Sequence, residues 1–313
     1  MQIIDNLADL PEPLTYPVLT IGVFDGVHRG HQTVLKRVVE QARSLGGTSI
    51  LLTFSPHPQR VISPGDSPLL LQTSRQKLQV LGHLGLDVTV MYPFTRDLSL
   101  LTPEQFARDI LYNHGIREIH VGGNFRFGHR RSGDFQTLKT LGERFGFAVY
   151  AVDPIHFRGQ RISSTRIRNL LQEGRAPLAA RLLGRPYRIA GTVVRGAGLG
   201  VKLGFPTANL NPENELVPAT GIYVTRTVIN EKFYRSVTSV GYRPTVEEKK
   251  IETPVVETYL LDFDGDLYGR TIALDFCFRL REEKKFDSLD VLKEHIAKDV
   301  ARTRRYLERT KCQ

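Results

Sequence analysis

The sequence predicts a protein of the α/β plus β class, in which a parallel sheet with helices on both faces precedes a small antiparallel barrel or sandwich. Three observations predict this organisation. The chain has 313 residues, which exceeds the usual span of one domain. Its first half alternates short apolar runs with amphipathic stretches, whereas its second half contains alternating, β-branched segments interrupted by Gly and Pro. We place the boundary near Gly184–Pro186, which gives domains 1–184 and 185–313.

The first half contains continuous apolar runs, which are typical of strands buried on both faces of a sheet. These runs predict strands at Val18–Phe24, Thr48–Phe54, Asp87–Tyr92, Glu118–Val121 and Phe147–Val152. Amphipathic stretches between them predict helices at His31–Leu45, Thr73–Leu84, Pro103–Asn113 and Asp134–Phe145. The alternation of strand and helix favours a parallel sheet.

The segments change character after Arg185-Pro186. Five stretches in this half alternate and are rich in β-branched residues: RIAGTVV, GIYVTRTVI, KFYRSVTSV, PVVETYLLDF and TIALDFCFRL. This pattern predicts antiparallel strands in a barrel or sandwich. A last amphipathic stretch, Ser288–Glu308, predicts a C-terminal helix.

The composition predicts a cytoplasmic protein that binds small molecules. The formal net charge of +10 suits either nucleic acid or small polyanions, but the chain has no recognisable nucleic-acid-binding motif, so we expect no nucleic-acid partner. No apolar stretch approaches the ~18 residues of a membrane span, and no secretory signal is visible, so we expect no membrane partner. Cys277 and Cys312 suggest neither a disulfide framework nor a zinc site. The sequence predicts no particular oligomeric state.

The segment Gly22–His31 has the features of a phosphate-binding turn. It lies where a predicted strand ends and a predicted helix begins, where free backbone N–H groups and the positive helix end attract phosphate. Gly26 and Gly30 allow a tight turn and a close approach of the backbone to a nucleotide. His28 and His31 would project from one helix face, where two imidazoles can stabilise the charge on a departing phosphate group.

These two histidines have two simpler interpretations. They are either ordinary surface residues at a helix start or a zinc-binding pair, since His at i and i+3 can bind zinc. No further ligand residue completes a zinc set, and the whole spaced motif favours phosphate binding over both alternatives.

A second candidate phosphate-binding segment spans Arg161–Arg168, with the sequence Arg-Ile-Ser-Ser-Thr-Arg-Ile-Arg. Its serines and threonine can cap a helix and offer hydroxyl and N–H groups to phosphate oxygens. Its arginines add positive charge that suits a departing pyrophosphate. A solvated basic helix start explains Arg166 equally well, whereas Ser164, Thr165 and Arg168 fit phosphate binding better.

The second half contains a Gly-rich segment, Gly196–Asn209, that matches neither a dinucleotide-binding Rossmann turn nor a P-loop. A flexible loop of this kind, with Lys202, can nevertheless cover phosphates. Thr207 and Asn209 would face one side of an extended segment, and their oxygens are ligands of the kind that Mg²⁺ prefers.

Glu257 is a candidate general base in the second half, because its carboxylate could take the proton of an attacking hydroxyl. The alternative is a solvent-facing strand residue. Asp262, Asp264 and Asp266 suggest a calcium loop, but the expected Glu is missing, so we expect a turn between strands with Gly265 at its tip.

The first-half motifs resemble the nucleotidyltransferase superfamily, and most closely the FMN adenylyltransferase module of bacterial FAD synthetases. The resemblance rests on Gly22–His31, Thr53–Pro58, Gly123–Gly128 and Arg161–Arg168. It implies a doubly wound nucleotidyltransferase domain in which His28 and His31 are catalytic. The nucleotide- or phosphate-binding residues that it implies are Gly22, Phe24, Asp25, Gly26, Gly30, Asn124, Arg161, Ser164, Thr165 and Arg168.

The same resemblance implies a flavin-binding set comprising Phe54, Pro56, Pro58, Phe125 and Phe127. Core packing is an equal alternative for the three Phe rings. Ser55 stands where this family usually has Asp.

The second-half motifs, Gly196–Asn209 and Val256–Gly269, resemble riboflavin kinases. The resemblance implies a small barrel in which Glu257 is the catalytic base and Thr207 and Asn209 hold magnesium. It implies further that ATP phosphates contact Gly198, Gly200 and Lys202, and that Arg243 contacts the flavin. Three positions depart from the family pattern and are expected to slow the kinase: Val201, Ser239 and Val246.

The two resemblances together imply a bifunctional enzyme that phosphorylates riboflavin to FMN and adenylylates FMN to FAD. ATP is the co-substrate of both steps, and Mg²⁺ is the expected cofactor. Three alternatives stay open: a monofunctional enzyme with a silent kinase half, a cytidylyltransferase-like enzyme with another phosphorylated acceptor, and a nucleic-acid-binding or regulatory protein on a retired enzyme scaffold.

Overall fold

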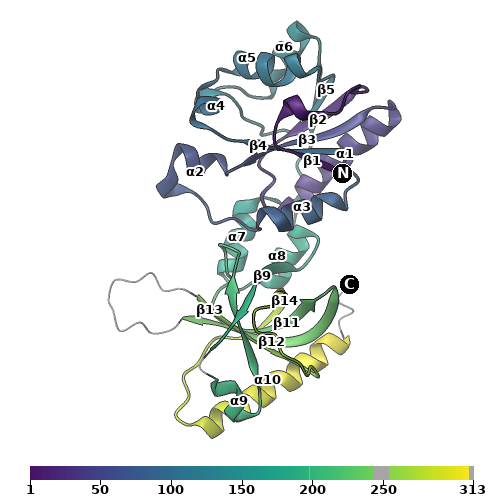
Figure 1. The fold of residues 1–313 in the computed structure, drawn as a ribbon. Helices are drawn as coiled ribbons and strands as arrows, with labels where there is room; N and C mark the ends of the chain where they lie inside the picture. The colour runs from purple at the N-terminus through teal and green to yellow at the C-terminus, as the bar shows by residue number, and fades with distance from the viewer. Residues whose placement is uncertain (197, 243–253, 310–313) are drawn as a thin grey trace. The chain divides into compact units, whose positions relative to one another are not determined.

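The computed structural model describes residues 1–196, 198–242 and 254–309, which form two compact units (Figure 1). The first unit contains Met1–Leu69 and Ser74–Ser163, and the second contains Leu70–Thr73 and the chain from Ser164 onward. The sequence places a boundary at 184, but helices α7 (Ser164–Gln172) and α8 (Ala176–Leu183) fold with the second unit. Helix α8 contacts strands of that unit and α7 contacts α8, which a strand–helix pattern alone does not reveal.

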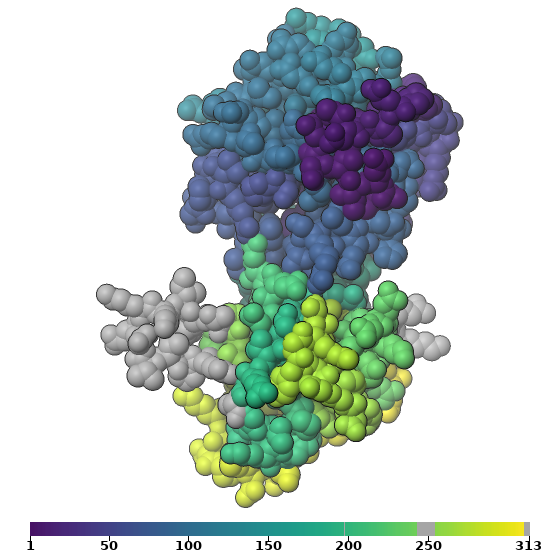
Figure 2. Space-filling model, viewed as in Figure 1, coloured from purple at the N-terminus to yellow at the C-terminus, as the bar shows by residue number. Residues whose placement is uncertain are grey.

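The first unit contains a six-stranded sheet in the order β1-β4-β3-β2-β5-β6, and every neighbouring pair is parallel. The strands are β1 (Gln2–Ile4), β2 (Pro17–Ile21), β3 (Thr48–Ser55), β4 (Val88–Pro93), β5 (Glu118–Gly122) and β6 (Ala148–Val152). This sheet confirms the predicted α/β class. The sequence did not predict β1, which is three residues long and lies among the purple surface residues of this unit (Figure 2).

Helices cover both faces of the sheet (Figure 1). They are α1 (Arg29–Ser44), α2 (Pro58–Ile62), α3 (Ser74–Gly82), α4 (Arg96–Leu100), α5 (Pro103–Phe106) and α6 (Phe135–Phe145). Side chains alternate along a strand, so Leu19 and Leu52 belong to the core cluster on one face, while Leu51 packs with Leu35 of α1 and Leu81 of α3 on the other. Double burial explains why these strands are apolar throughout.

Strand β2 lies between β3 and β5, so the chain leaves its C-terminal end in the middle of the sheet. The strands that follow β2 in the chain lie on both sides of it, so the strand order reverses direction at β2. Open α/β sheets bind ligands in the crevice at the point of such a reversal. The predicted strand Val18–Phe24 ends three residues early, at Ile21, because Phe24 adopts a left-handed conformation with φ 51°. The residues after Ile21 form a turn instead.

The second unit is a closed barrel in which each strand is antiparallel to its neighbours. Its strands are β9 (Tyr187–Val194), β10 (Thr207–Pro212), β11 (Gly221–Ile229), β12 (Lys232–Tyr242), β13 (Pro254–Leu260) and β14 (Thr271–Arg281). The structure therefore selects the barrel from the two predicted alternatives. A two-residue hairpin at Asn230-Glu231, both with positive φ, joins β11 to β12.

The barrel interior contains a connected group of buried hydroxyls. It comprises Thr225, Thr227, Ser236, Thr238 and Thr258, all with 0% exposure. The oxygen atoms of Thr225 and Thr238 are 2.7 Å apart, and Thr238 donates to Thr258 over 3.0 Å. Mutual hydrogen bonding removes the cost of burying these polar groups.

The predicted C-terminal helix is α10 (Leu289–Arg309), which packs against β11 and β12. A buried ion pair anchors it, because Nε of Arg281 in β14 lies 2.9 Å from Oδ2 of Asp299. The ring of Tyr306 also stacks on Phe278, with centroids 5.2 Å apart.

We expect Asp299→Ala to destabilise the second unit by about 2 kcal/mol, because it removes the carboxylate that pairs with the partly buried guanidinium of Arg281. Urea unfolding followed by circular dichroism measures the loss. Glu294→Ala is the control on the same helix, since Glu294 forms only an exposed pair with Lys298, and it should change stability by less than about 0.5 kcal/mol. Equal effects of the two substitutions would contradict the anchoring role.

Candidate active sites

The first site is built on the turn between β2 and α1. The N–H of Gly22 still pairs with the carbonyl of Leu52, and the chain then turns through Phe24 at φ 51°, Gly26 at φ 78° and Val27 at φ 37°. Left-handed backbone is unfavourable for Phe and Val. Both side chains are buried, with exposures of 4% and 0%, and Asp25 between them is buried too. Core packing thus holds the turn in a conformation that the backbone alone disfavours.

His28 and His31 lie together at the start of α1, as the spacing predicted. Their rings are stacked, with centroids 3.6 Å apart and planes inclined by 14°. His28 is the N-cap residue, and its Nδ1 accepts a hydrogen bond from the N–H of His31 over 3.2 Å. Because Nδ1 accepts this hydrogen bond, Nε2 is the nitrogen that can donate to a ligand. A Cβ at Gly30 would lie 3.2 Å from the His28 ring, which explains glycine there.

The surroundings of His31 are buried and positively charged. Burial lowers the pKa of His31 well below its ordinary value of 6.5, and His28, Lys77 and Arg161 lower it further. Its Nδ1 is buried and has no hydrogen-bond partner within the described part of the chain. A neutral imidazole can donate a hydrogen bond to a phosphate oxygen. The neighbouring cationic groups attract the negative charge of the same phosphate.

Two other predicted segments meet in the first unit. Asn124 follows β5, and Arg161 ends the short strand β8 (Gln160–Arg161), which pairs with β7 (His156–Phe157). The guanidinium of Arg161 donates a hydrogen bond to Oδ1 of Asn124. Both side chains are exposed and so accessible to a ligand.

The predicted flavin-binding residues differ in accessibility. Phe54 at the end of β3 and Phe125 after β5 are each half-buried and pack on the same core cluster. Phe127 is only 6% exposed, and its ring stacks on that of Phe125 with centroids 5.4 Å apart. Pro56 is exposed and Pro58 opens α2.

Ser164, Thr165 and Arg168 lie in the first two turns of α7, which belongs to the second unit. Ser164 is the first residue of the helix. Their proposed role in phosphate binding stays a prediction.

The second site lies on the outer face of the barrel. Glu257 on β13 is paired in register with Asn209 on β10 and with Ser239 on β12. Directly opposed residues of antiparallel strands project to the same face, and Thr207 joins them because it precedes Asn209 by two residues. The sequence therefore predicted correctly that Thr207 and Asn209 share a face, and the structure adds Glu257 to it.

The Gly-rich loop lies against this face. A Cβ at Gly196 would lie 2.6 Å from Oδ1 of Asn209, and a Cβ at Gly200 would lie 3.0 Å from Oγ1 of Thr207. Glycine is required at both positions because the loop backbone approaches the strand so closely. The loop continues through the short helix α9 (Leu199–Leu203), which Gly198 precedes with φ 72° and in which Lys202 and Val201 are exposed.

Asn209 and Thr207 fit a magnesium ion that is shared with a phosphate ligand. Oδ1 of Asn209 is buried and, among the described residues, lacks a hydrogen-bond partner. No group of three His, Cys, Asp or Glu residues in the described ranges could enclose a metal ion. A site with a few neutral oxygens suits Mg²⁺, which retains waters and takes substrate phosphates as ligands.

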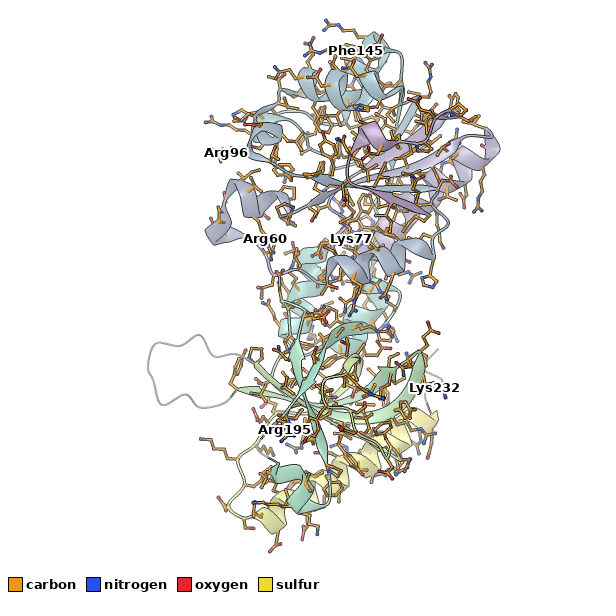
Figure 3. All side chains as sticks on the ribbon, in the orientation of Figure 1. Arg60, Lys77, Arg96, Phe145, Arg195 and Lys232 are labelled. Carbon is orange, nitrogen blue, oxygen red and sulfur yellow. The ribbon has the colours of Figure 1, made fainter. Side chains whose placement is uncertain are left out.

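One residue of the first site was not predicted from the sequence, and two of the kinase positions named above lie outside the described part of the chain. These two positions are Arg243 and Val246. Lys77 of α3, labelled in Figure 3, is 7% exposed, and its ammonium donates to the carbonyl of Val23 and to Oγ1 of Thr53, each over 2.6 Å. A single lysine within an amphipathic helix is usually solvated, so the pattern gave no signal of its burial.

We predict that His31 remains neutral well below pH 6.5 in the folded protein. The unfolded chain takes up this proton near pH 6.5 and the folded chain does not, so His31 makes the fold less stable as the pH falls through 6.5. An NMR titration of the imidazole C–H signals, with the urea-unfolded chain as control, measures the difference. Titration of His31 at or above pH 6.5 would contradict the buried, cationic environment.

The chain matches two protein families and several bifunctional relatives. FAD synthetase matches residues 11–166, and riboflavin kinase matches residues 183–307. Among the described residues, no helix is both long and apolar enough to cross a membrane.

The relatives match over nearly their whole length. A protein of Pseudomonas fluorescens named bifunctional riboflavin kinase/FMN adenylyltransferase is 40% identical to this chain over 97% of each chain. A protein of the same name from Escherichia coli strain K12 is 37% identical over 98% of this chain and 97% of that one. A crystal structure of a protein described as a macrolide-efflux protein, from Streptococcus pneumoniae, has a TM-score of 0.87 and 29% identity over 96% of this chain and 98% of that chain. The chain belongs to the family of bifunctional riboflavin kinase/FMN adenylyltransferases.

Proposed function

We propose that the chain phosphorylates riboflavin to FMN with ATP and then transfers AMP from a second ATP to FMN, which yields FAD and pyrophosphate. The observation that carries this proposal is that the chain matches both families, and that the turn with His28 and His31 lies in the first unit, whereas Thr207, Asn209 and Glu257 lie in the second. We assign the transferase to domain 1–184 and the kinase to domain 185–313. We expect both reactions in the cytoplasm, with small molecules as partners.

In the transferase reaction, a phosphate oxygen of FMN attacks the α-phosphorus of ATP, and the bond to the bridging oxygen breaks as pyrophosphate leaves. The attacking phosphate is already an anion, so positioning and charge stabilisation dominate over proton transfer. His28 would donate from Nε2, and His31 from its neutral ring, to oxygens that gain charge in the transition state. Gly22, Phe24, Asp25, Gly26 and Gly30 would form the turn that receives the nucleotide.

Further residues would bind the phosphates and the flavin. Arg161 and Asn124 are already hydrogen-bonded to each other in the first unit and would contact the nucleotide. We assign the departing phosphates to Ser164, Thr165 and Arg168. We assign the flavin of the transferase to Phe54, Pro56, Pro58, Phe125 and Phe127, and that of the kinase to Arg243.

In the kinase reaction, Glu257 would accept the proton of the 5′-hydroxyl of riboflavin as that oxygen attacks the γ-phosphorus and ADP leaves. Thr207 and Asn209 would hold Mg²⁺ beside Glu257, on the face that the strand register creates. When bound, Mg²⁺ would neutralise part of the negative charge of the ATP phosphates. Gly198, Gly200 and Lys202 would cover the ATP phosphates, and the departures at Val201, Ser239 and Val246 would slow the reaction.

Two substitutions should separate the activities. In incubations with ATP and Mg²⁺, His28→Ala should lower FAD formation from FMN at least about 100-fold, the effect of losing a transition-state donor, while FMN formation from riboflavin survives. Glu257→Gln should abolish FMN formation and leave FAD formation from FMN intact. Chromatography of the flavins measures both reactions in one sample.

The wild-type chain serves as the reference, started from riboflavin in one sample and from FMN in another. An equal loss of both activities in His28→Ala would contradict two separate sites. FAD formed from FMN alone would indicate a silent kinase, and conversion of neither flavin would favour a retired enzyme scaffold.

We predict that Gly196→Ala lowers the kinase activity at least about tenfold by displacing the Asn209 side chain, because a methyl group there would overlap the amide. The transferase activity should not change. Gly82→Ala is the matched control, since a Cβ there meets nothing within 4 Å. Unchanged riboflavin phosphorylation in Gly196→Ala would show that Asn209 is not needed in its observed position.

A further inference from the structure

Lys77 forms a closed set of hydrogen bonds behind the turn of the first site. Its ammonium donates to the carbonyl oxygen of Val23 over 2.6 Å and to Oγ1 of Thr53 over 2.6 Å. The hydroxyl of Thr53 in turn donates to the same Val23 carbonyl over 3.1 Å. Three atoms from α3, the β2–α1 turn and β3 are therefore tied together at one point.

The position of this contact in the chain connects it to the catalytic histidines. Val23 immediately precedes Phe24, where the backbone enters its left-handed conformation, and His28 follows five residues later. The carbonyl of Val23 accepts hydrogen bonds from the side chains of Lys77 and Thr53 and does not pair with a backbone N–H of β3, because β2 has already ended at Ile21. The ammonium thus fixes the orientation of the peptide at which the turn begins.

Packing alone does not explain a lysine at this position. Burial disfavours the charged form and lowers the pKa of Lys77 to about 8, against the opposing influence of the Asp25 carboxylate. An apolar side chain of the same length, such as methionine, would fill the space without the penalty of burying an ammonium. The buried ammonium is compensated by its hydrogen bonds to Val23 and Thr53, so its charge and its contacts are directed at the turn of the site.

The charge of Lys77 also acts on the site directly. It is one of the positive groups that lower the pKa of His31, as is Arg161. Lys77 therefore helps to keep His31 neutral. A neutral ring can donate a hydrogen bond to a phosphate, while the neighbouring cations interact with the charge of that phosphate.

We propose that Lys77 is a positioning residue for adenylyl transfer, which holds the strained β2–α1 turn through Val23 and Thr53 so that His28 and His31 face the nucleotide. The inference rests on the proposed transferase function of the first unit. Lys77 contacts the turn and β3 and acts on the reaction through them.

The first experiment compares Lys77→Met with the wild-type chain at pH 7. The turnover number for FAD formation should fall about 100-fold, the effect of displacing catalytic groups by about 1 Å, while KM for FMN changes less than about threefold. FMN formation from riboflavin by the second unit should not change, so the same polypeptide supplies its own control for folding. Lys139→Met removes the same charge from an exposed position of α6 and should leave both activities unchanged.

An NMR titration of His31 provides a readout that does not depend on activity. Removal of the Lys77 charge should raise the pKa of His31 toward its ordinary value, whereas Lys139→Met should not move it. The shift reports that the charge of Lys77 acts on His31 in the folded protein, and the Thr53 variants test the contact with the turn.

A second pair of variants tests the contact if Lys77→Met fails to fold. Thr53→Val removes the hydroxyl that bridges Lys77 and Val23 while keeping the shape of the side chain, and it should lower the turnover number about tenfold. Thr53→Ser keeps the hydroxyl and should restore most of that loss.

The outcomes separate this inference from the proposed function. Wild-type protein that makes no FAD from FMN overturns the proposed transferase, and the His31 titration then still decides whether the charge of Lys77 acts on His31. Full transferase turnover in folded Lys77→Met, or equal turnover in Thr53→Val and Thr53→Ser, overturns the positioning role. Parallel loss of kinase and transferase activity in Lys77→Met overturns it as well, because it indicates general misfolding.

Discussion

The first site depends on a turn whose backbone strain is offset by the core beneath it. Left-handed conformations at residues such as Phe24 and Val27 cost roughly 1–3 kcal/mol each, and burying side chains of this kind contributes roughly 1.5–3 kcal/mol each. The two effects are similar in size, so the turn keeps its shape only while both side chains stay packed against α1, α3 and β3. The same residues thus serve the stability of the sheet and the placement of the histidines. Lys77 reinforces that arrangement from within the core.

The second site depends on strand register instead of strain. Glu257 lies between Asn209 and Ser239 because three strands pair in one alignment. A slip of one residue would direct Glu257 into the interior, among the buried hydroxyls, and would turn Thr258 outward. Closure of the barrel resists such a slip, because every strand has neighbours on both sides. Both sites therefore occupy positions that the surrounding fold determines, by core packing in one unit and by strand pairing in the other.

Periodicity in the sequence was sufficient to predict the parallel strands, the final helix and the adjacency of Thr207 and Asn209. Motif spacing likewise predicted that His28 and His31 lie together at a helix start, which the structure confirms. Such patterns could not predict contacts between residues that are far apart in the sequence. The burial of Lys77 depends on Val23 and Thr53, which are distant in the sequence, and the membership of α7 in the second unit depends on contacts with later residues. Strand β1 is too short to show an alternation.

The placement of α7 and α8 bears on how the two halves of the gene product can be divided. Dividing the chain at residue 184 would separate α7 and α8 from the barrel, although their residues Leu171 and Leu182 are completely buried. It would also separate Gln72 from Arg185, from which Gln72 accepts a hydrogen bond over 3.1 Å. A break at 163 would keep the helices with the barrel but would take Ser164 and Thr165 away from the half whose reaction they are proposed to serve. Neither division leaves the barrel with both of its helices and the first half with Ser164 and Thr165. Separate expression of either proposed activity would therefore require a segment that belongs to the other half.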